Sequence, residues 1–124
     1  MNLIHRPSGD PARIVRLGPY ALEPLLARDE TAGASAYRVN IAPGETTAVS
    51  FHQVAEEFYF VLAGSGTATL NGEARTLNAG DFLRLPPGTT HGFTAGPNGL
   101  DMLDFHTPGC FPDHDTFFAG KRAW

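Results

Sequence analysis

The sequence has a single cysteine, Cys110, among its 124 residues. One cysteine cannot form an intrachain disulfide, and it excludes a metal site built from several thiolates. We expect Cys110 to be a small, partly buried apolar side chain rather than a nucleophile. A reducing compartment suits this cysteine content, so a cytoplasmic location is expected.

Long apolar runs and an excess of basic residues are also missing. No stretch reaches the roughly 18 apolar residues of a membrane helix, and residues 1–7 lack the apolar core of a signal peptide. Nine Lys and Arg against 13 Asp and Glu give a formal net charge of −4. The basic residues are scattered, so no basic face is available to neutralise phosphates. We expect a soluble protein that binds neither a membrane nor nucleic acid.

Uninterrupted helical patterns are absent, because 14 glycines and 10 prolines divide the chain into short segments. Between them lie runs rich in Val, Ile, Leu, Thr, Phe and Tyr, which are typical of strands joined by turns. Asn71-Gly72 is a hairpin signal because both residues tolerate positive φ, and residues 64–66 are expected to form a turn. The expected strands are 14–17, 20–27, 35–42, 48–52, 56–63, 67–70, 74–77, 82–85, 91–95 and 100–106. The sequence therefore predicts one all-β domain, a sandwich or a barrel.

Four polar residues stand near the ends of these expected strands. Ser50 and His52 are two positions apart, so their side chains lie on the same face of a strand. Glu57 begins the next strand, and His91 follows the rigid Pro-Pro-Gly turn at 86–88. Two imidazoles and a carboxylate that converge inside a barrel suit a divalent metal with open positions for water or substrate.

The spacing of these residues resembles the two motifs of the cupin superfamily. Residues 44–64 read G-x5-S-F-H-x4-E-x6-G, and residues 80–91 read G-x5-P-P-G-x2-H. The family has a histidine at the position of Ser50 and an asparagine at the position of Ala95. The resemblance implies a small single-domain cupin, that is, a double-stranded β-helix or jelly-roll barrel. In such a fold we expect N-terminal strands or an arm over 1–34, the barrel core over 35–107 and a C-terminal arm over 108–124.

The ligand set that this resemblance implies is His52, Glu57 and His91. A hydroxyl is a poor ligand beside imidazole, so Ser50 is expected to hydrogen-bond a metal-bound water or a substrate. Two histidines and one carboxylate are associated with non-haem Fe(II) oxygen chemistry, although Zn, Mn, Ni or Co would also fit. In the alternative without metal, the two histidines bond to Glu57 and Ser50 and form a polar patch for an organic ligand.

Two neighbouring positions leave a choice. Glu56 is the alternative to Glu57, but the spacing to Gly64 favours Glu57. His106 is a candidate fourth ligand if it faces inward, and the alternative is a surface or satisfied core histidine.

These residues favour a metal-dependent enzyme of the dioxygenase or isomerase type, acting on a small organic molecule, with Glu57 or Ser50 handling protons. Whether the chain is an enzyme stays open, because cupin folds serve many functions. The alternatives are a non-catalytic binder of a sugar or acid, and a metal-free isomerase or lyase with His52 or His91 as general base. The resemblance also implies a homodimer, for which the tail aromatics are a candidate contact: Phe111, Phe117, Phe118 and Trp124.

Overall fold

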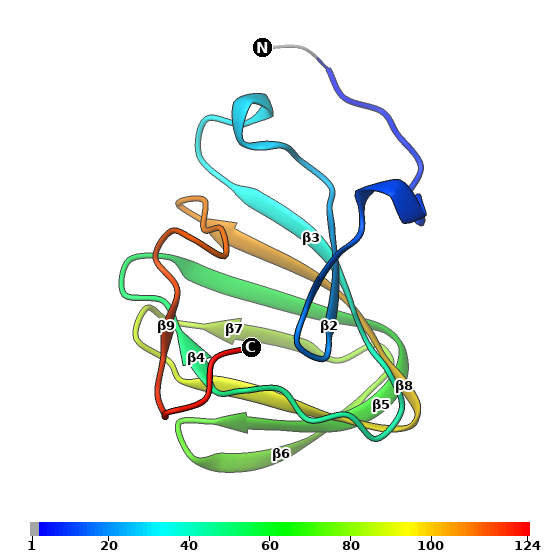
Figure 1. The fold of residues 1–124 in the computed structure, drawn as a ribbon, viewed down its shortest axis with the longest axis vertical. Coiled ribbons are helices and arrows are strands. Elements are labelled where there is room, and N and C mark those ends of the chain that lie inside the picture. The colour runs from blue at the N-terminus through cyan, green and yellow to red at the C-terminus, as the bar shows by residue number, and fades with distance from the viewer. Residues whose placement is uncertain (1–2) are drawn as a thin grey trace.

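The computed structural model describes residues 3–124, and almost all of its regular structure is β (Figure 1). Of two short 3-10 segments, η1 (Pro11–Arg13) precedes the first strand and η2 (Arg28–Glu30) lies between the second and third strands. The strands are β1 (Val15–Leu17), β2 (Tyr20–Pro24), β3 (Ser35–Ile41), β4 (Ser50–Phe51), β5 (Glu56–Leu70), β6 (Glu73–Asn78), β7 (Phe82–Leu85), β8 (His91–Thr107) and β9 (Phe117–Phe118). The all-β prediction is confirmed.

The two longest strands, β5 and β8, pair antiparallel along most of their length and form the spine of the barrel. On one side β3 pairs with β8, β2 with β3, and β1 with β2. On the other side β6 and β7 both pair with β5. Short β4 pairs with the start of β8 and with β9. The sheet curls into the barrel that the motifs predicted (Figure 1).

The prediction of a turn at residues 64–66 is wrong, because β5 runs through them. Its register against β8 shifts between Val61 and Ala63 and again between Gly64 and Gly66, which bends the paired strands. Gly64 has φ +80°, and a Cβ there would lie 2.1 Å from the carbonyl oxygen of Gly99. Glycine is thus required by a close approach of two strands. The same bend joins the expected strands 91–95 and 100–106 into β8.

The apolar core lies at one end of the barrel interior. Val39, Ile41, Val61 and Met102 are all 1% exposed or less, and they come from β3, β5 and β8. Side chains alternate along a strand, so residues two and four positions away from these core residues also face the interior. On each strand, the residues on one side of the core position reach the other end of the barrel. Polar residues occupy that end.

The C-terminal arm, residues 108–124, folds back across the barrel and, within the described chain, contains no helix (Figure 1). Its strand β9 pairs with β4, where the rings of Phe51 and Phe117 stack. Trp124 packs edge-on against Tyr20, with the ring centroids 6.1 Å apart. The arm therefore covers the polar end of the interior. None of the helical segments within residues 3–124 is long and apolar enough to cross a membrane.

Candidate metal centre

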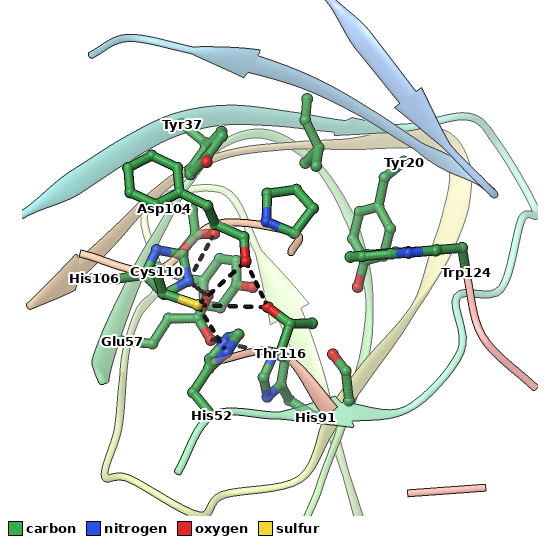
Figure 2. Close-up of a pocket in the computed structure, with 15 residues that line it drawn as sticks. Tyr20, Tyr37, His52, Glu57, His91, Asp104, His106, Cys110, Thr116 and Trp124 are labelled. Carbon is green, nitrogen blue, oxygen red and sulfur yellow. Dashed lines mark hydrogen bonds and ion pairs between the residues drawn. The ribbon is translucent and has the colours of Figure 1, made fainter. Parts of the chain in front are cut away.

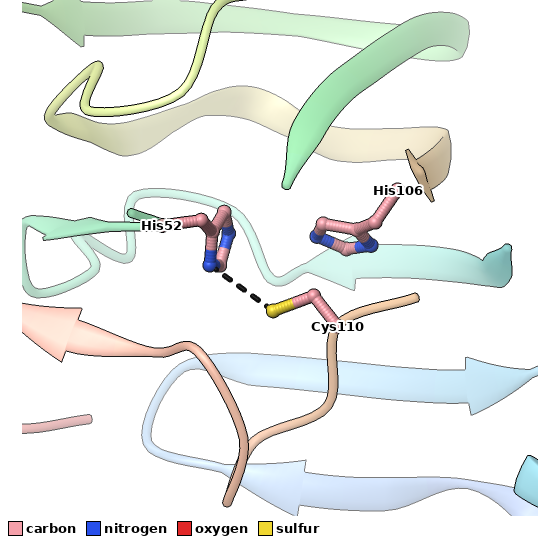
Figure 3. Close-up of side chains that lie close together, drawn as sticks. All are labelled: His52, His106 and Cys110. Carbon is pink, nitrogen blue, oxygen red and sulfur yellow. Dashed lines mark hydrogen bonds between the residues drawn. The ribbon is translucent and has the colours of Figure 1, made fainter. Parts of the chain in front are cut away.

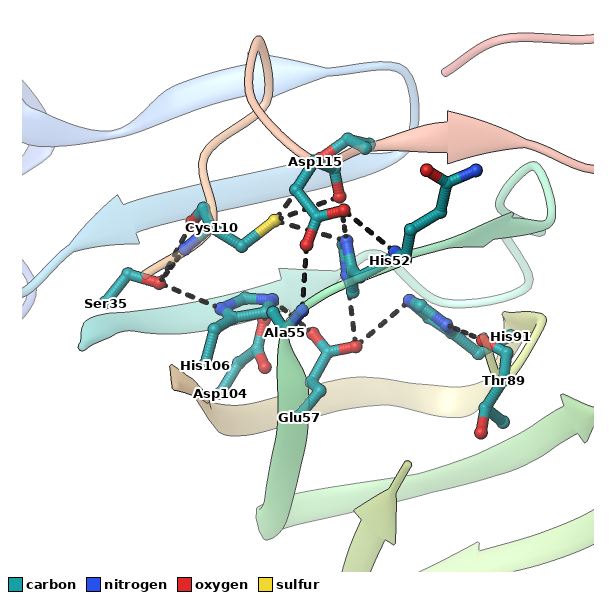
Figure 4. Close-up of polar contacts among 12 residues, drawn as sticks. Ser35, His52, Ala55, Glu57, Thr89, His91, Asp104, His106, Cys110 and Asp115 are labelled. Atoms are coloured by element: carbon teal, nitrogen blue, oxygen red, sulfur yellow. Dashed lines mark hydrogen bonds and ion pairs between the residues drawn. The ribbon is translucent and has the colours of Figure 1, made fainter. Parts of the chain in front are cut away.

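Three imidazoles gather around one carboxylate at the polar end of the barrel (Figure 2). Glu57 lies near the start of β5 and is 2% exposed. His52 follows β4, His91 begins β8, and His106 stands near the end of β8, and all three are buried. His91 Nε2 lies 3.2 Å and His52 Nε2 3.3 Å from Glu57 Oε1, and His106 Nε2 lies 2.6 Å from Glu57 Oε2. All three Nε2 atoms thus face the same carboxylate (Figure 4).

Backbone carbonyls fix the orientation of two of these rings. His52 Nδ1 donates to the carbonyl oxygen of Asp115 at 2.7 Å, and His91 Nδ1 donates to that of Thr89 at 3.0 Å. A carbonyl oxygen can only accept, so each Nδ1 carries a proton. In the neutral ring, Nε2 then presents a lone pair toward Glu57, which is the arrangement of a metal ligand.

A hydroxyl fixes His106 in the same way. Ser35 Oγ accepts from the backbone N–H of Cys110 and donates to the carbonyl oxygen of Cys110, both at 2.9 Å. A hydroxyl has one proton, so His106 Nδ1, 3.1 Å from Ser35 Oγ, must be the donor in that contact. His106 Nε2 is left to face Glu57.

The carboxylate at the centre is not satisfied by these neighbours. Glu57 Oε1 is buried and, within residues 3–124, has no hydrogen-bond partner, although two imidazole nitrogens lie close to it. A buried charge without a partner is costly, and a cation shared with His52 and His91 removes that cost. The ligand atoms of these three residues lie within 4.8 Å of one another. The donor set therefore fits a divalent transition metal.

The charges of the cluster support the same interpretation. Burial lowers the pKa of His91, so this ring is neutral and available as a ligand. Burial also lowers the pKa of His52, but its contacts with Cys110 and Glu57 outweigh burial and raise it to about 10. Burial raises the pKa of Glu57, but the nearby histidines, His91 first, bring it well below its ordinary value. A neutral His91 beside an ionised Glu57 is a charge arrangement that suits a bound cation.

The two remaining residues of the expected site lie on opposite sides of the barrel wall. Ser50 is buried, lines the cavity and pairs with His91 across β4 and β8. Glu56 lies on the outer surface, where its carboxylate accepts a hydrogen bond from Arg84 at 2.6 Å. Glu57 is therefore the carboxylate that reaches the cavity.

Asp104 was not foreseen from the sequence as part of the site. It is buried on β8, and its carboxylate lies 3.7 Å from His106 Nε2. Burial, and then the charge of Glu57, raises the pKa of Asp104 well above its ordinary value. The available signal was its position two residues before His106, which puts both side chains on one face.

Cys110 and Asp115 were also missed. Cys110 is buried, but its sulfur lies 3.1 Å from His52 Nδ1 (Figure 3), and its thiol donates to the carbonyl oxygen of His114. Cys110 is therefore more deeply buried than expected, and its sulfur contacts polar groups. The Asp115 carboxylate accepts hydrogen bonds from three successive backbone N–H groups, those of residues 53–55. Both residues reach the site only because the arm crosses the barrel, which no local pattern indicates.

The cavity enclosed by these residues is small, about 50 Å³. Tyr20, Tyr37 and Tyr59 form part of its wall, together with Trp124 from the arm (Figure 2). Burial raises the pKa of Tyr59 well above its ordinary value, so its phenol stays neutral. The site is thus a small pocket around Glu57, lined largely by aromatic and titratable side chains.

Known proteins resemble this chain in sequence and in fold. Mannose-1-phosphate guanylyltransferase ManC of Salmonella typhimurium is 29% identical over 79 residues, 63% of this chain and 16% of that protein. Quercetin 2,3-dioxygenase of Bacillus subtilis is 29% identical over 68 residues, 55% of this chain and 20% of that protein. The chain therefore matches only about a fifth or less of the length of these relatives.

A solved structure of a Streptomyces PAC13 variant with uridine superposes with a TM-score of 0.75, over 94% of this chain and 92% of that one. At 19% identity, this likeness concerns the fold. A family model described as the cupin domain matches residues 37–105, more than half of the chain. The strands, the barrel and both motifs lead to the same conclusion: this chain belongs to the cupin family.

Proposed function

We propose that the chain binds a divalent transition metal through His52, Glu57 and His91, with His106 as fourth ligand, and is a metal-dependent enzyme acting on a small organic molecule. The single observation that carries the proposal is Glu57 Oε1, buried without a hydrogen-bond partner within residues 3–124 and facing two imidazole nitrogens. The cupin relative named a dioxygenase supports a reaction of the dioxygenase type, and an isomerase is kept beside it. When bound, the metal supplies Lewis-acid polarisation of a substrate oxygen.

The residues around the ligands would bind the substrate and move protons. Ser50 presents a hydroxyl to the cavity beside His91 and is suited to bind a substrate oxygen. Asp104 is buried near Glu57 with a raised pKa and would serve as a general acid. The buried walls, Tyr59 among them, exclude bulk water and strengthen these interactions. Glu57 keeps a negative charge at the centre, whether a metal or a proton faces it.

A metal titration of the His91→Ala variant tests this proposal. Removing one of the ligands should weaken binding of Zn, Mn, Ni or Co more than about 100-fold, measured by calorimetry. His5→Ala, an exposed histidine outside the cluster, is the matched control and should bind like the wild type. Backbone NMR spectra of each variant check that the barrel is folded.

Two results would overturn the metal centre. One is a His91→Ala variant that binds metal as tightly as the wild type. The other is a folded wild-type protein that binds none of these metals. The second result would favour the alternative in which His52 and His91 act without metal, as acid–base groups or as part of a ligand-binding patch.

We also propose that the protein forms a homodimer through apolar side chains on the outer face of β5, β7 and β8. This phenylalanine face consists of Phe58, Phe60, Leu62, Phe82 and Phe105. Four of its members are 39% to 62% exposed, and Phe58 stacks on Phe82. Contiguous exposed apolar residues of this kind mark protein contacts. By contrast, Trp124 of the arm packs on its own barrel.

A further inference from the structure

The inner cavity is too small for an organic substrate. Pockets for small organic ligands measure roughly 300–1,000 Å³. The 50 Å³ around Glu57 therefore accommodates an ion or a single reacting group, but not a whole substrate. The rest of a substrate must lie elsewhere.

A second pocket of about 290 Å³ adjoins this cavity. The two spaces share four lining residues: Leu22 and Tyr37 from the strands, and Phe111 and Pro112 from the arm. These residues form a common wall. We call the second space the outer pocket. Its size suits the body of a small organic molecule, and it lies next to the inner cavity across this wall.

The chemistry of the outer pocket is apolar with one positive charge. Most of its lining is apolar, namely Val15, Leu22, Pro24, Leu26, Ala27, Phe111 and Pro112. Arg28 is the single charged residue of the lining within residues 3–124. An apolar pocket with one well-placed charged group binds an apolar body that carries the opposite charge at one end.

The Arg28 side chain is oriented for such a role. Its guanidinium lies over the Phe111 ring, 4.4 Å from the ring centroid, and this cation–π contact holds it beside the pocket. It also pairs with Asp113, and the two side chains are 55% and 72% exposed. An ion pair this exposed contributes little, so a ligand carboxylate can share or replace it. Guanidinium groups bind carboxylates through paired N–H donors.

We infer that the outer pocket binds a small carboxylic acid with an apolar body, whose carboxylate pairs with Arg28 and whose other end faces the inner cavity. The acid would be the substrate of the proposed metal centre, so its reaction rests on that function, whereas its binding does not. Asp113 competes with the acid for Arg28. Phe111 and Pro112, on the arm, form the part of the wall that must move for the substrate to pass.

The test compares 3-phenylpropanoate with its uncharged primary amide as probes, by NMR titration of the whole chain. Each titration is run on zinc-loaded protein and on protein stripped with a chelator. The acid should bind about tenfold more tightly than the amide, because a charge-assisted hydrogen bond is lost with the amide. Backbone shifts should concentrate at residues 26–28 and 111–113.

Three variants separate this site from a general effect of charge. Arg28→Gln should abolish the preference for the acid, and Asp113→Asn should tighten acid binding about threefold by removing the competing carboxylate. Arg75→Gln, on the exposed hairpin strand β6, is the matched control and should behave like the wild type. Thermal unfolding and NMR spectra confirm that each variant is folded.

Equal affinity for acid and amide would overturn the inference, as would an unchanged preference in Arg28→Gln or shifts confined to other parts of the barrel. Because the acid is titrated with and without zinc, failure of the metal centre can be distinguished from failure of the acid site. Acid binding to stripped protein supports the outer pocket even if no metal binds. If zinc binds tightly but the acid and the amide bind equally well, the metal centre is supported and the acid site is contradicted.

Discussion

The two ends of the barrel interior are built from the same strands but have opposite chemistry. The apolar half consists of Val39, Ile41, Val61, Leu100 and Met102, and the polar half of His52, Glu57, His91, Asp104 and His106. On β8, a single residue separates Met102 from Asp104. A position therefore faces inward because of the strand period, whereas its chemistry depends on which end of the barrel it reaches. The apolar half stabilises the paired strands in register, and that register places the candidate ligands.

The largest effect on stability is expected from the apolar half. Ile41 is fully buried, so Ile41→Ala should lower the free energy of unfolding by about 2–5 kcal/mol, measured with a chemical denaturant. Metal affinity under folding conditions should stay unchanged, because no ligand moves. Val54→Ala, at a position 63% exposed, is the control and should change stability by less than about 0.5 kcal/mol. If Ile41→Ala weakened metal binding as strongly as loss of a ligand, stability and metal binding would not be assigned to separate halves of the interior.

In the polar half, His106→Ala distinguishes a fourth ligand from a core histidine. We expect metal affinity to fall about 10- to 100-fold while the stoichiometry stays the same, because three ligands remain. The visible spectrum of the cobalt-loaded protein should change with the coordination. His114→Ala, an exposed histidine of the arm, should change neither. An unaltered cobalt spectrum in His106→Ala would show that this ring does not bind the metal.

A smaller effect is expected where the arm attaches to the polar half. The Asp115 carboxylate caps three N–H groups, so Asp115→Ala should cost about 1 kcal/mol of stability and speed hydrogen exchange at residues 53–55. Burial raises the pKa of Asp115, but these N–H groups lower it below the ordinary 3.8. A folded-state pKa below the unfolded one means stabilisation above pH 3.8, lost as the pH falls through the folded-state value.

Denaturation of wild type and Asp115→Ala at neutral pH and at strongly acidic pH checks this sign. The difference between the two proteins should shrink in acid. A difference that grew on acidification would contradict the role of the ionised carboxylate. Asp81→Ala is a useful control, because Asp81 caps the backbone N–H of Asn78 at a surface turn far from the arm in sequence.

The smallest effect on the subunit itself is expected on the outer face of the barrel. Phe82→Glu introduces a charge into the phenylalanine face and should convert the proposed dimer to a monomer, measured by light scattering after gel filtration. The stability of the isolated subunit should change by less than about 0.5 kcal/mol, since Phe82 is 62% exposed. Thr76→Glu on exposed β6 is the control. A wild-type protein that stays monomeric at high concentration would contradict the proposed dimer.

Much of the fold could be predicted because its signals are local. The Asn71-Gly72 hairpin is confirmed, with φ of 50° and 81° at the two positions. The predicted turn at 64–66 failed because glycine also serves where two bent strands approach closely, and that approach depends on a partner about 35 residues away. Sequence pattern alone cannot distinguish a glycine in a turn from a glycine in a bulge.

The candidate site was predictable where a motif fixes the spacing, as for His52, Glu57 and His91. Cys110 and Asp115 were not, because they reach His52 across 58 and 63 residues of chain through the packing of the arm. Asp104 could be predicted only in part: alternation along β8 puts it on the same face as His106, but no motif marks it as a site residue. Local periodicity therefore predicts which side chains face inward, and tertiary packing decides which of them meet.

Elemental analysis of the untagged protein, purified without added metal, tests the central claim most directly. We predict close to one equivalent of a divalent transition metal per chain, and a content near zero in Glu57→Gln prepared in the same way. A folded wild-type protein without metal, even after incubation with Fe, Mn, Co, Ni and Zn, would contradict the metal centre. So would a Glu57→Gln variant that keeps the wild-type metal content.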